Sequence, residues 1–266
     1  MRRFLILTFS LPAFLFFTMS SMAKPYSISL SDAQTDILAN LIWQNEGAKK
    51  IKNLTVWNKN EAFPSLGIGH FIWYPTKEKG PYIEQFPELL TYIKAQNITI
   101  PPWLINIKTA PWQSREAFYD AFEHSQLREL RVFLEKTIQL QALFIIKRLE
   151  TGIPAILASS TKVERDKLEK EIFTLTSTPE GIFVLLDYIN FKGEGISIKE
   201  RYQGKGWGLK QVLLAMPDHS NNILASFALS ADEVLTRRVK NAPKNEINWL
   251  KGWRVRIHKY PTLKIK

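Results

Sequence analysis

The chain has no cysteine and only four histidines among its 266 residues. The absence of cysteine excludes disulfides, zinc sites built from thiolates and a thiol nucleophile. The histidines stand at positions 70, 124, 219 and 258, too far apart to form a paired metal motif such as HExxH. We therefore expect neither a metal ion nor another cofactor.

Long apolar runs are missing after the N-terminus. Residues 4–17 are apolar but for three positions, a run shorter than the ~20 residues that a membrane-spanning helix needs. Arg2 and Arg3 precede this run, and the small residues of the segment 21–23 follow it, an arrangement typical of a signal peptide. We expect cleavage after residue 23, which leaves a single exported domain over residues 24–266. An uncleaved anchor is the alternative.

Lysine and arginine outnumber aspartate and glutamate by 36 to 25, a formal charge of +11. Such an excess favours an anionic partner. For an exported chain without disulfides we expect a bacterial periplasmic or secreted protein, an anionic wall polymer as partner, and no nucleic acid. No stable membrane insertion is expected once the signal is removed, and a polycationic glycan such as chitosan would be repelled.

The first half of the mature chain contains one helix and a small sheet. Ser31 with Gln34 three residues later predicts a capping box for a helix over residues 32–45, and Gly47 is expected to end it. Turn signals between β-forming segments predict a β-hairpin or three-stranded sheet over residues 53–75. Its glycines at 67 and 69 alternate along a strand, which suits either a close ligand approach or a tight hairpin.

The rest of the chain has helical patterns. An amphipathic stretch runs from Ser114 to about Leu149 with one break, and further helices are predicted over 162–174, 179–190, 207–215, 231–240 and 245–257. One helix, a small sheet and then many helices indicate a mainly helical α+β fold. The sequence assigns no role to the helical middle, residues 84–180.

Two carboxylates can meet across the predicted turn between helix and sheet. Glu46 lies on the last turn of the first helix and Glu61 on the hairpin, and the chain between them can fold back on itself. Hydrolysis of a glycosidic bond needs a carboxylic acid and a carboxylate. The apolar neighbours of Glu46 favour its protonated form, and the polar neighbours of Glu61 favour ionisation. Spacing alone favours the simpler reading of two ordinary surface glutamates, since such a pair is commonplace.

The segment Asn45-Glu46-Gly47, followed by a hairpin that closes on Gly67-Ile68-Gly69-His70, resembles the phage-type lysozymes and the wider lysozyme-like superfamily. The resemblance implies a lysozyme-like fold with a small sheet lobe and an enlarged helical lobe. It implies that Glu46 is the general acid and that His70 is a structural hydrogen bonder.

The family has a threonine just before the Gly-Ile-Gly-His segment, where it holds the catalytic water, and Ser65 takes that place here. The family's second acid maps onto Lys59, which leaves Glu61 as the nearest carboxylate. The resemblance continues at residues 188–195, similar to a Phe-Asn-x-Gly-x-Gly segment that lines the family's cleft, and at 249–256, similar to its closing arginine-rich helix. The chain also resembles exported bacterial proteins of uncharacterised function that carry SLGIGHFIWYP and ERYQGKGWGL.

Five glycines lie between residues 193 and 208, with Tyr202 and Trp207 among them. No phosphate-loop pattern occurs there. Such a loop suits sugar binding, although an ordinary surface loop would look similar, and Glu194 and Glu200 are further candidates for the second carboxylate. The candidate substrate-binding residues are His70, Trp73, Tyr74, Asn190, Glu194, Tyr202, Gln203 and Trp207. The basic C-terminus, which includes Arg254 and Arg256, is expected to be a solvated face.

These features together predict an exported glycosidase that cleaves the β-1,4 glycan of peptidoglycan. Glu46, Glu61 and Ser65 are the candidate catalytic residues. A lytic transglycosylase that uses Glu46 alone remains open, because the attacking group in that chemistry is the sugar's own hydroxyl. A non-catalytic envelope protein that binds glycan in the same cleft is the third possibility.

Overall fold

The computed structural model describes residues 26–77, 80, 82–218 and 221–265. The signal peptide expected over 1–23 lies outside the described residues. The helices are α1 (Asp32–Gly47), α2 (Phe86–Ala95), α3 (Arg115–Asp120), α4 (Ser125–Lys136), α5 (Ile138–Ala158), α6 (Lys162–Thr176), α7 (Pro179–Lys192), α8 (Leu209–Ala215), α9 (Ile223–Asn241) and α10 (Ile247–Ile257). Short 3-10 helices are η1 (Ile51–Leu54), η2 (Pro102–Leu104) and η3 (Tyr260–Thr262). The strands are β1 (Thr55–Val56), β2 (Ser65–Leu66), β3 (Phe71–Ile72), β4 (Arg201–Tyr202) and β5 (Lys205–Gly206). The expectation of a mainly helical chain with a small sheet is confirmed.

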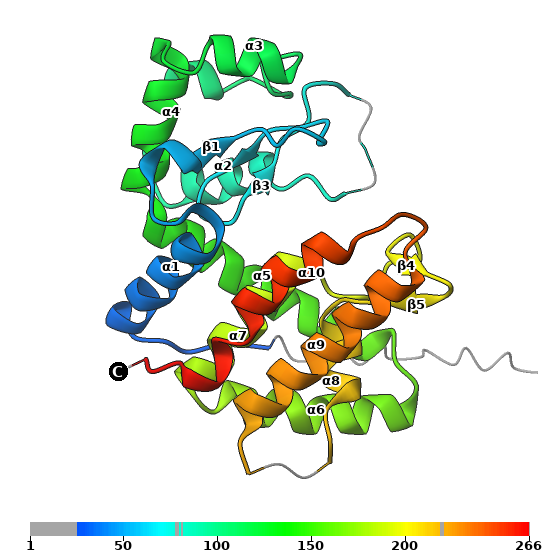
Figure 1. Cartoon of the computed structure of the whole chain (residues 1–266). Helices are drawn as coiled ribbons and strands as arrows, with labels where there is room; N and C mark the ends of the chain where they lie inside the picture. The colour runs from blue at the N-terminus through cyan, green and yellow to red at the C-terminus, as the bar shows by residue number, and fades with distance from the viewer. Residues whose placement is uncertain (1–25, 78–79, 81, 219–220, 266) are drawn as a thin grey trace, which may run out of the picture.

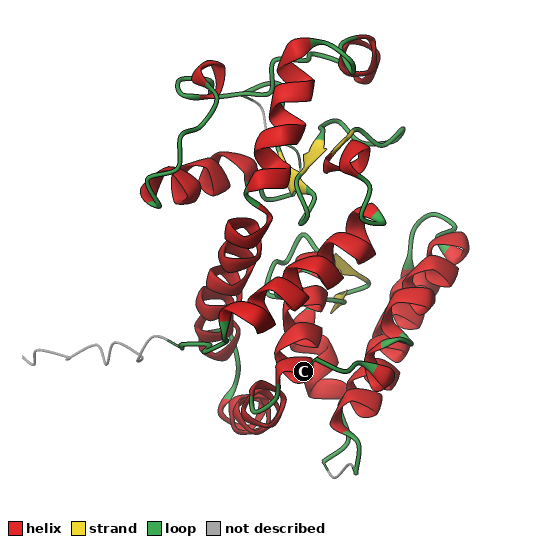
Figure 2. Cartoon of the chain, turned by 90° about the vertical axis from the view of Figure 1, so that its left-hand side faces the viewer, coloured by secondary structure: helices red, strands yellow, loops and turns green. Residues whose placement is uncertain are grey.

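The sheet and the helical bundle form separate lobes (Figures 1 and 2). The three-stranded sheet lies with α2, α3 and α4, and the helices α6 to α9 pack on one another in the second lobe. The long helix α5 contacts α1, α2 and α7, so it joins the lobes. No helix among the described residues is both long and apolar enough to cross a membrane.

The first helix begins as the sequence predicts. The Ser31 hydroxyl accepts from the Gln34 backbone N–H, and the Gln34 side chain accepts from the Ser31 N–H, which completes the capping box. The helix runs two residues past its predicted end at residue 45. Gly47 is still helical, and Ala48 takes the left-handed conformation, with φ 50°. A Cβ on Gly47 would come within 3.0 Å of Trp43 Cδ1, so close packing accounts for this glycine. Glu46 is thereby held in the last turn.

The three strands are antiparallel in the order β1-β2-β3, with Ser65 opposite both Val56 and Ile72. The expectation that Gly67 and Gly69 alternate along a strand is wrong, because residues 67–70 form the turn between β2 and β3. Gly67 has φ +72°, which favours glycine, and a Cβ there would collide with the Gln141 side chain.

Gln141 on α5 holds this turn in place through hydrogen bonds. Its side chain is fully buried, its Oε1 accepts from the Ile68 N–H at 2.8 Å, and its Nε2 donates to the Leu134 carbonyl at 2.6 Å. Because the next residues of the turn include His70, the helix that joins the lobes also positions one side of the cleft.

Several predicted helices have different bounds. The stretch from Ser114 breaks twice, into α3, α4 and α5, and continues past Leu149 to Ala158 with Pro154 inside the last helix. The helix expected at 207 begins at Leu209, because residues 201–206 form the β4–β5 hairpin. The helix expected at 231 begins at Ile223 instead, since the Asn222 side chain caps it by accepting from the Ala225 N–H.

Candidate active site

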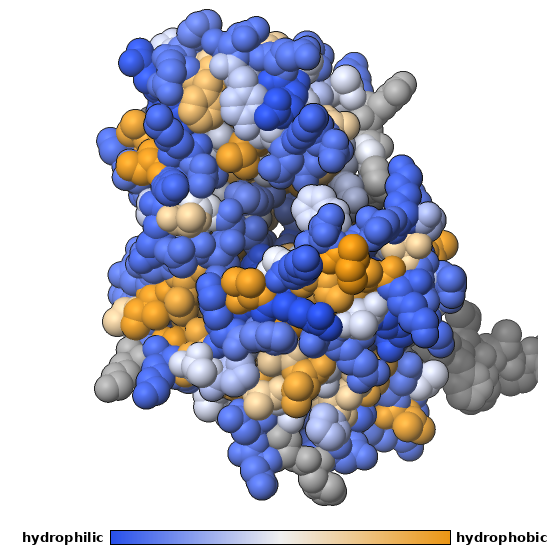
Figure 3. Space-filling model, viewed as in Figure 1, coloured by the Kyte–Doolittle hydropathy of each residue, from blue (hydrophilic) through white to orange (hydrophobic). Residues whose placement is uncertain are grey.

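A cleft of about 540 Å³ opens where the two lobes meet. The space-filling view shows a hollow on this face between the lobes (Figure 3). Its walls come from the end of α1, the sheet with the loops before β2 and after β3, helix α5, the end of α7 with its following loop, and α9. The cleft gathers most of the candidate residues: Glu46, Glu61, Ser65, His70, Tyr74, Asn190, Glu194, Glu200 and Trp207.

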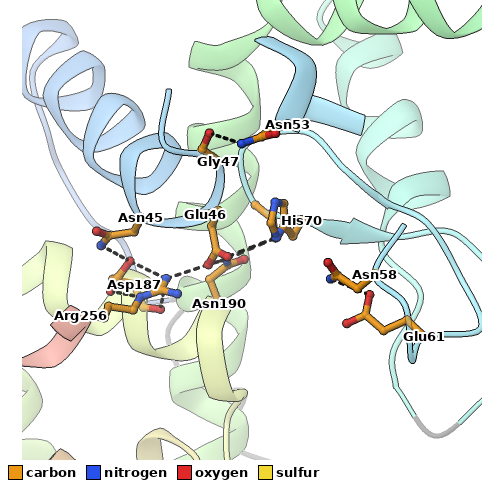
Figure 4. A network of polar contacts seen from close by, with 11 residues as sticks. Asn45, Glu46, Gly47, Asn53, Asn58, Glu61, His70, Asp187, Asn190 and Arg256 are labelled. Carbon is orange, nitrogen blue, oxygen red and sulfur yellow. Dashed lines mark hydrogen bonds and ion pairs between the residues drawn. The ribbon is translucent and has the colours of Figure 1, made fainter. Parts of the chain in front are cut away.

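The Glu46 carboxylate lies at the centre of a polar network (Figure 4). Its Oε1 accepts from Arg256 Nη2 at 2.7 Å and from Asn190 Nδ2 at 3.2 Å. Its Oε2 faces His70 Nδ1 at 3.4 Å. The side chain is only 13% exposed. One carboxylate oxygen is therefore anchored by two donors, and the other faces the imidazole.

Asp187 on α7 completes the network behind Glu46. The Arg256 guanidinium lies 2.7 Å from both of its carboxylate oxygens, and Tyr260 donates to it at 2.6 Å. Asn45, next to Glu46 in the chain, donates to it at 3.1 Å. Burial alone would raise the pKa of Asp187, but Arg256 and these hydrogen bonds outweigh it and hold the pKa below its ordinary value. Arg256 is thus a bridge between a buried carboxylate and Glu46.

Glu61 lies in the segment before β2 and lines the same cleft. Burial raises the pKa of Glu61 above its ordinary value, although a hydrogen bond from Asn58 at 3.0 Å and the proximity of His70 act in the opposite direction. The backbone carbonyl of Glu61 accepts from Trp57 Nε1 at 2.8 Å, which fixes the segment against the sheet. The two carboxylates therefore have contrasting surroundings in one cleft.

Ser65 and His70 belong to the sheet lobe. Ser65 lies on β2 and is 4% exposed, and its hydroxyl makes no hydrogen bond with the described part of the chain. His70 has φ 50° at the end of the β2–β3 turn. Its Nε2 and the Oδ1 of Asn190 are buried, and neither finds a partner among the described residues. Both residues line the cleft, although these two atoms themselves are buried beneath its surface.

The far wall of the cleft carries charged groups in pairs. Glu194 lies 3.3 Å from Arg148 on α5, and Arg238 on α9 lies 3.1 Å from Glu246. Burial raises the pKa of Glu200, and the neighbouring Glu194 raises it further. Trp207 lines the cleft with its ring 4.3 Å below the Arg238 guanidinium carbon.

Three candidate sugar-binding residues lie elsewhere. Trp73 is fully buried and packs on Phe86, because it follows Ile72 on the chain and points to the opposite face of the sheet. Tyr202 does not line the cleft, since its ring packs on Trp207. Its hydroxyl donates to Glu246 at 2.9 Å. Gln203 is exposed at the tip of the β4–β5 hairpin, outside the cleft, with φ 49°. Tyr74 does line the cleft, although only 2% of it is exposed.

The basic side chains around the cleft were not predicted from the sequence. Arg256 was assigned to a solvated face, but it is 10% exposed and faces inward to Asp187. Its position three residues after Trp253 on an amphipathic helix gave some signal, whereas nothing in the local sequence pointed to Arg148 or Arg238. Arg148 lies in the middle of α5 and Arg238 in the last turn of α9, and only the tertiary fold brings them to the cleft.

No group of three histidine, aspartate or glutamate side chains that could hold a metal ion occurs among the described residues. Comparison with models of protein families, with curated proteins and with solved structures finds no match for this chain. The cleft and its chemistry are therefore the evidence for function.

Proposed function

We propose that the protein is an exported glycoside hydrolase with a lysozyme-like fold that cleaves the β-1,4 glycan of peptidoglycan. The observation that carries the proposal is that Glu46 and Glu61, from different segments, line one cleft in contrasting surroundings. A volume of about 540 Å³ lies within the ~300–1,000 Å³ of typical ligand sites. Two carboxyl groups of this kind are what most glycosidases use.

Glu46 is proposed as the proton donor to the leaving oxygen. Arg256 and Asn190 hold its Oε1, which fixes the carboxyl group and leaves Oε2 to carry the proton toward the cleft. Glu61 supplies the second carboxylate, either to activate water or to stabilise the oxocarbenium-like transition state, and the Ser65 hydroxyl helps to position the water. The side chains of His70 and Asn190, which line the cleft, would contact the bound sugar.

The raised pKa of Glu61 favours a second assignment, in which the two glutamates exchange roles. Substrates with acidic aryl leaving groups distinguish the assignments, because they leave without protonation. If Glu46 is the proton donor, Glu46→Gln should keep activity on a nitrophenyl glycoside of the glycan while it loses activity on the natural polymer. If instead Glu61→Gln keeps activity on the nitrophenyl glycoside and Glu46→Gln does not, the roles are exchanged.

Digestion of purified peptidoglycan by the mature protein, with mass spectrometry of the soluble products, tests the function. Reducing-end muropeptides are the expected products. Anhydro-muropeptides, lighter by one water, would show a lytic transglycosylase, which needs Glu46 but no water-activating carboxylate. Tight binding to the polymer without release of any product would overturn the enzymatic proposal and support a binding protein.

A further inference from the structure

Lys192 is the last residue of α7, and its side chain reaches into the wall of the cleft. Its Nζ lies 3.9 Å from the Phe191 ring centroid and 3.6 Å from the Trp253 ring centroid. Aromatic faces attract a cation but offer no hydrogen-bond acceptor of carboxylate strength. Within the described part of the chain this ammonium makes no hydrogen bond and no ion pair.

The other cations around the cleft differ from Lys192 in this respect. Arg148 has Glu194 at 3.3 Å, and Arg238 has Glu246 at 3.1 Å. Arg256 pairs with both Asp187 and Glu46 at 2.7 Å. Lys192 is half-buried in the same wall with no ion pair to any described residue, an arrangement that costs free energy unless a partner arrives from outside.

The surroundings of Lys192 shift the pKa of its ammonium group. Burial lowers the pKa of Lys192 well below its ordinary value, and the positive charges of Arg238 and Arg256 lower it further. The carboxylates of Glu246 and Glu46 act in the opposite direction but do not compensate. An anion bound against Nζ would supply the missing counter-charge and raise the pKa of Lys192 again.

We propose that Lys192 binds a carboxylate carried by the substrate, so that the cleft prefers an acidic amino-sugar polymer to a neutral one. The inference rests on the proposed function, because it concerns the same cleft. A monoanion fits better than a phosphate dianion, since Glu46, Glu61, Glu194 and Glu200 also line the cleft and would repel a second negative charge. Lysine contributes a compact point charge on a flexible chain, suited to a single carboxylate.

Binding of sulfur-linked tetrasaccharides, which resist cleavage, tests the proposal by calorimetry at low salt. Three probes alternate N-acetylglucosamine with N-acetylmuramic acid. The first has free lactyl carboxylates, the second has them converted to primary amides, and the third has an alanyl-glutamate dipeptide on each. We expect the wild type to bind the acid form about tenfold or more tightly than the amide, the size expected for one charge-assisted hydrogen bond. Tighter binding of the dipeptide form than of the acid form would assign the recognised carboxylate to the peptide.

Lys192→Gln should bind the acid and the amide equally, whereas the control Lys199→Gln, at an exposed position outside the cleft, should keep the preference. The comparison of the acid and amide probes on the wild type needs no variant, so it does not depend on whether a variant folds.

Equal binding of the acid and the amide by the wild type, or a preference that survives in Lys192→Gln, would overturn the inference and leave the proposed function intact. Failure of all three probes to bind would instead overturn the proposed function, and the inference with it.

Discussion

Arg256 Nη2 lies 2.7 Å from Glu46 Oε1, although 210 residues separate the two in the sequence. The last long helix therefore reaches across the molecule to the end of the first. Arg256 is itself fixed by Asp187, which is fully buried. The position of the candidate catalytic carboxyl thus depends on a residue of the helical lobe that no substrate needs to touch.

Replacing Asp187 by Asn should lower the free energy of unfolding by about 3–5 kcal/mol, because it leaves the buried charge of Arg256 without its main partner. Chemical unfolding followed by tryptophan fluorescence measures the loss. Asp232→Asn is the matched control, since Asp232 pairs with Arg254 at a more exposed site, and it should cost no more than about 1 kcal/mol. Equal losses in the two variants would contradict the role assigned to Asp187.

The same carboxylate should make stability depend on pH in acid. The pKa of Asp187 is lower in the folded protein than in the unfolded chain, so its contribution is present above the unfolded pKa of about 3.9 and disappears as the pH falls through the folded value. We expect the unfolding free energy of the wild type to fall more steeply with acidification than that of Asp187→Asn. Parallel curves for the two proteins would show that Asp187 is not the group responsible.

Glu61 should have the opposite effect. Its folded pKa is raised, so ionisation of Glu61 destabilises the folded protein as the pH rises through the interval between its unfolded and folded pKa values. Glu61→Gln should therefore unfold at a higher temperature than the wild type at neutral pH, and this advantage should vanish in acid. A lower melting temperature at neutral pH would mean that the Glu61 carboxylate is stabilising, and that its surroundings are not those described.

The sequence predicts the local features of this fold well. The Ser31 capping box, the small sheet after it and most of the later helices follow from short-range patterns. The errors lie where tertiary contacts override such patterns. Gly67 and Gly69 read as strand positions but form a turn, because Gln141, far along the chain, holds the Ile68 N–H.

The candidate site was predictable on its N-terminal side and in part of the opposite wall, where Asn190, Glu194, Glu200 and Trp207 line the cleft as expected. Glu46, Glu61, Ser65 and His70 lie close together in sequence and meet in one cleft. The rest of the opposite wall is assembled from helices whose inward positions cannot be read from composition, so Arg148, Lys192 and Arg238 were missed. Trp73 was misassigned because an aromatic residue beside a cleft strand can face either side of it, and here it faces the core.

The rate of product release from purified sacculi by the wild type and by Glu46→Gln tests the central claim most directly. Glu88→Gln, in the first turn of α2 and outside the cleft, is the control. We expect the wild type and the control to release soluble muropeptides at similar rates. Glu46→Gln should still bind the sacculi, but it should release soluble muropeptides about 10²–10⁴-fold more slowly, the usual effect of losing a general acid. Release by Glu46→Gln at the wild-type rate would contradict the account.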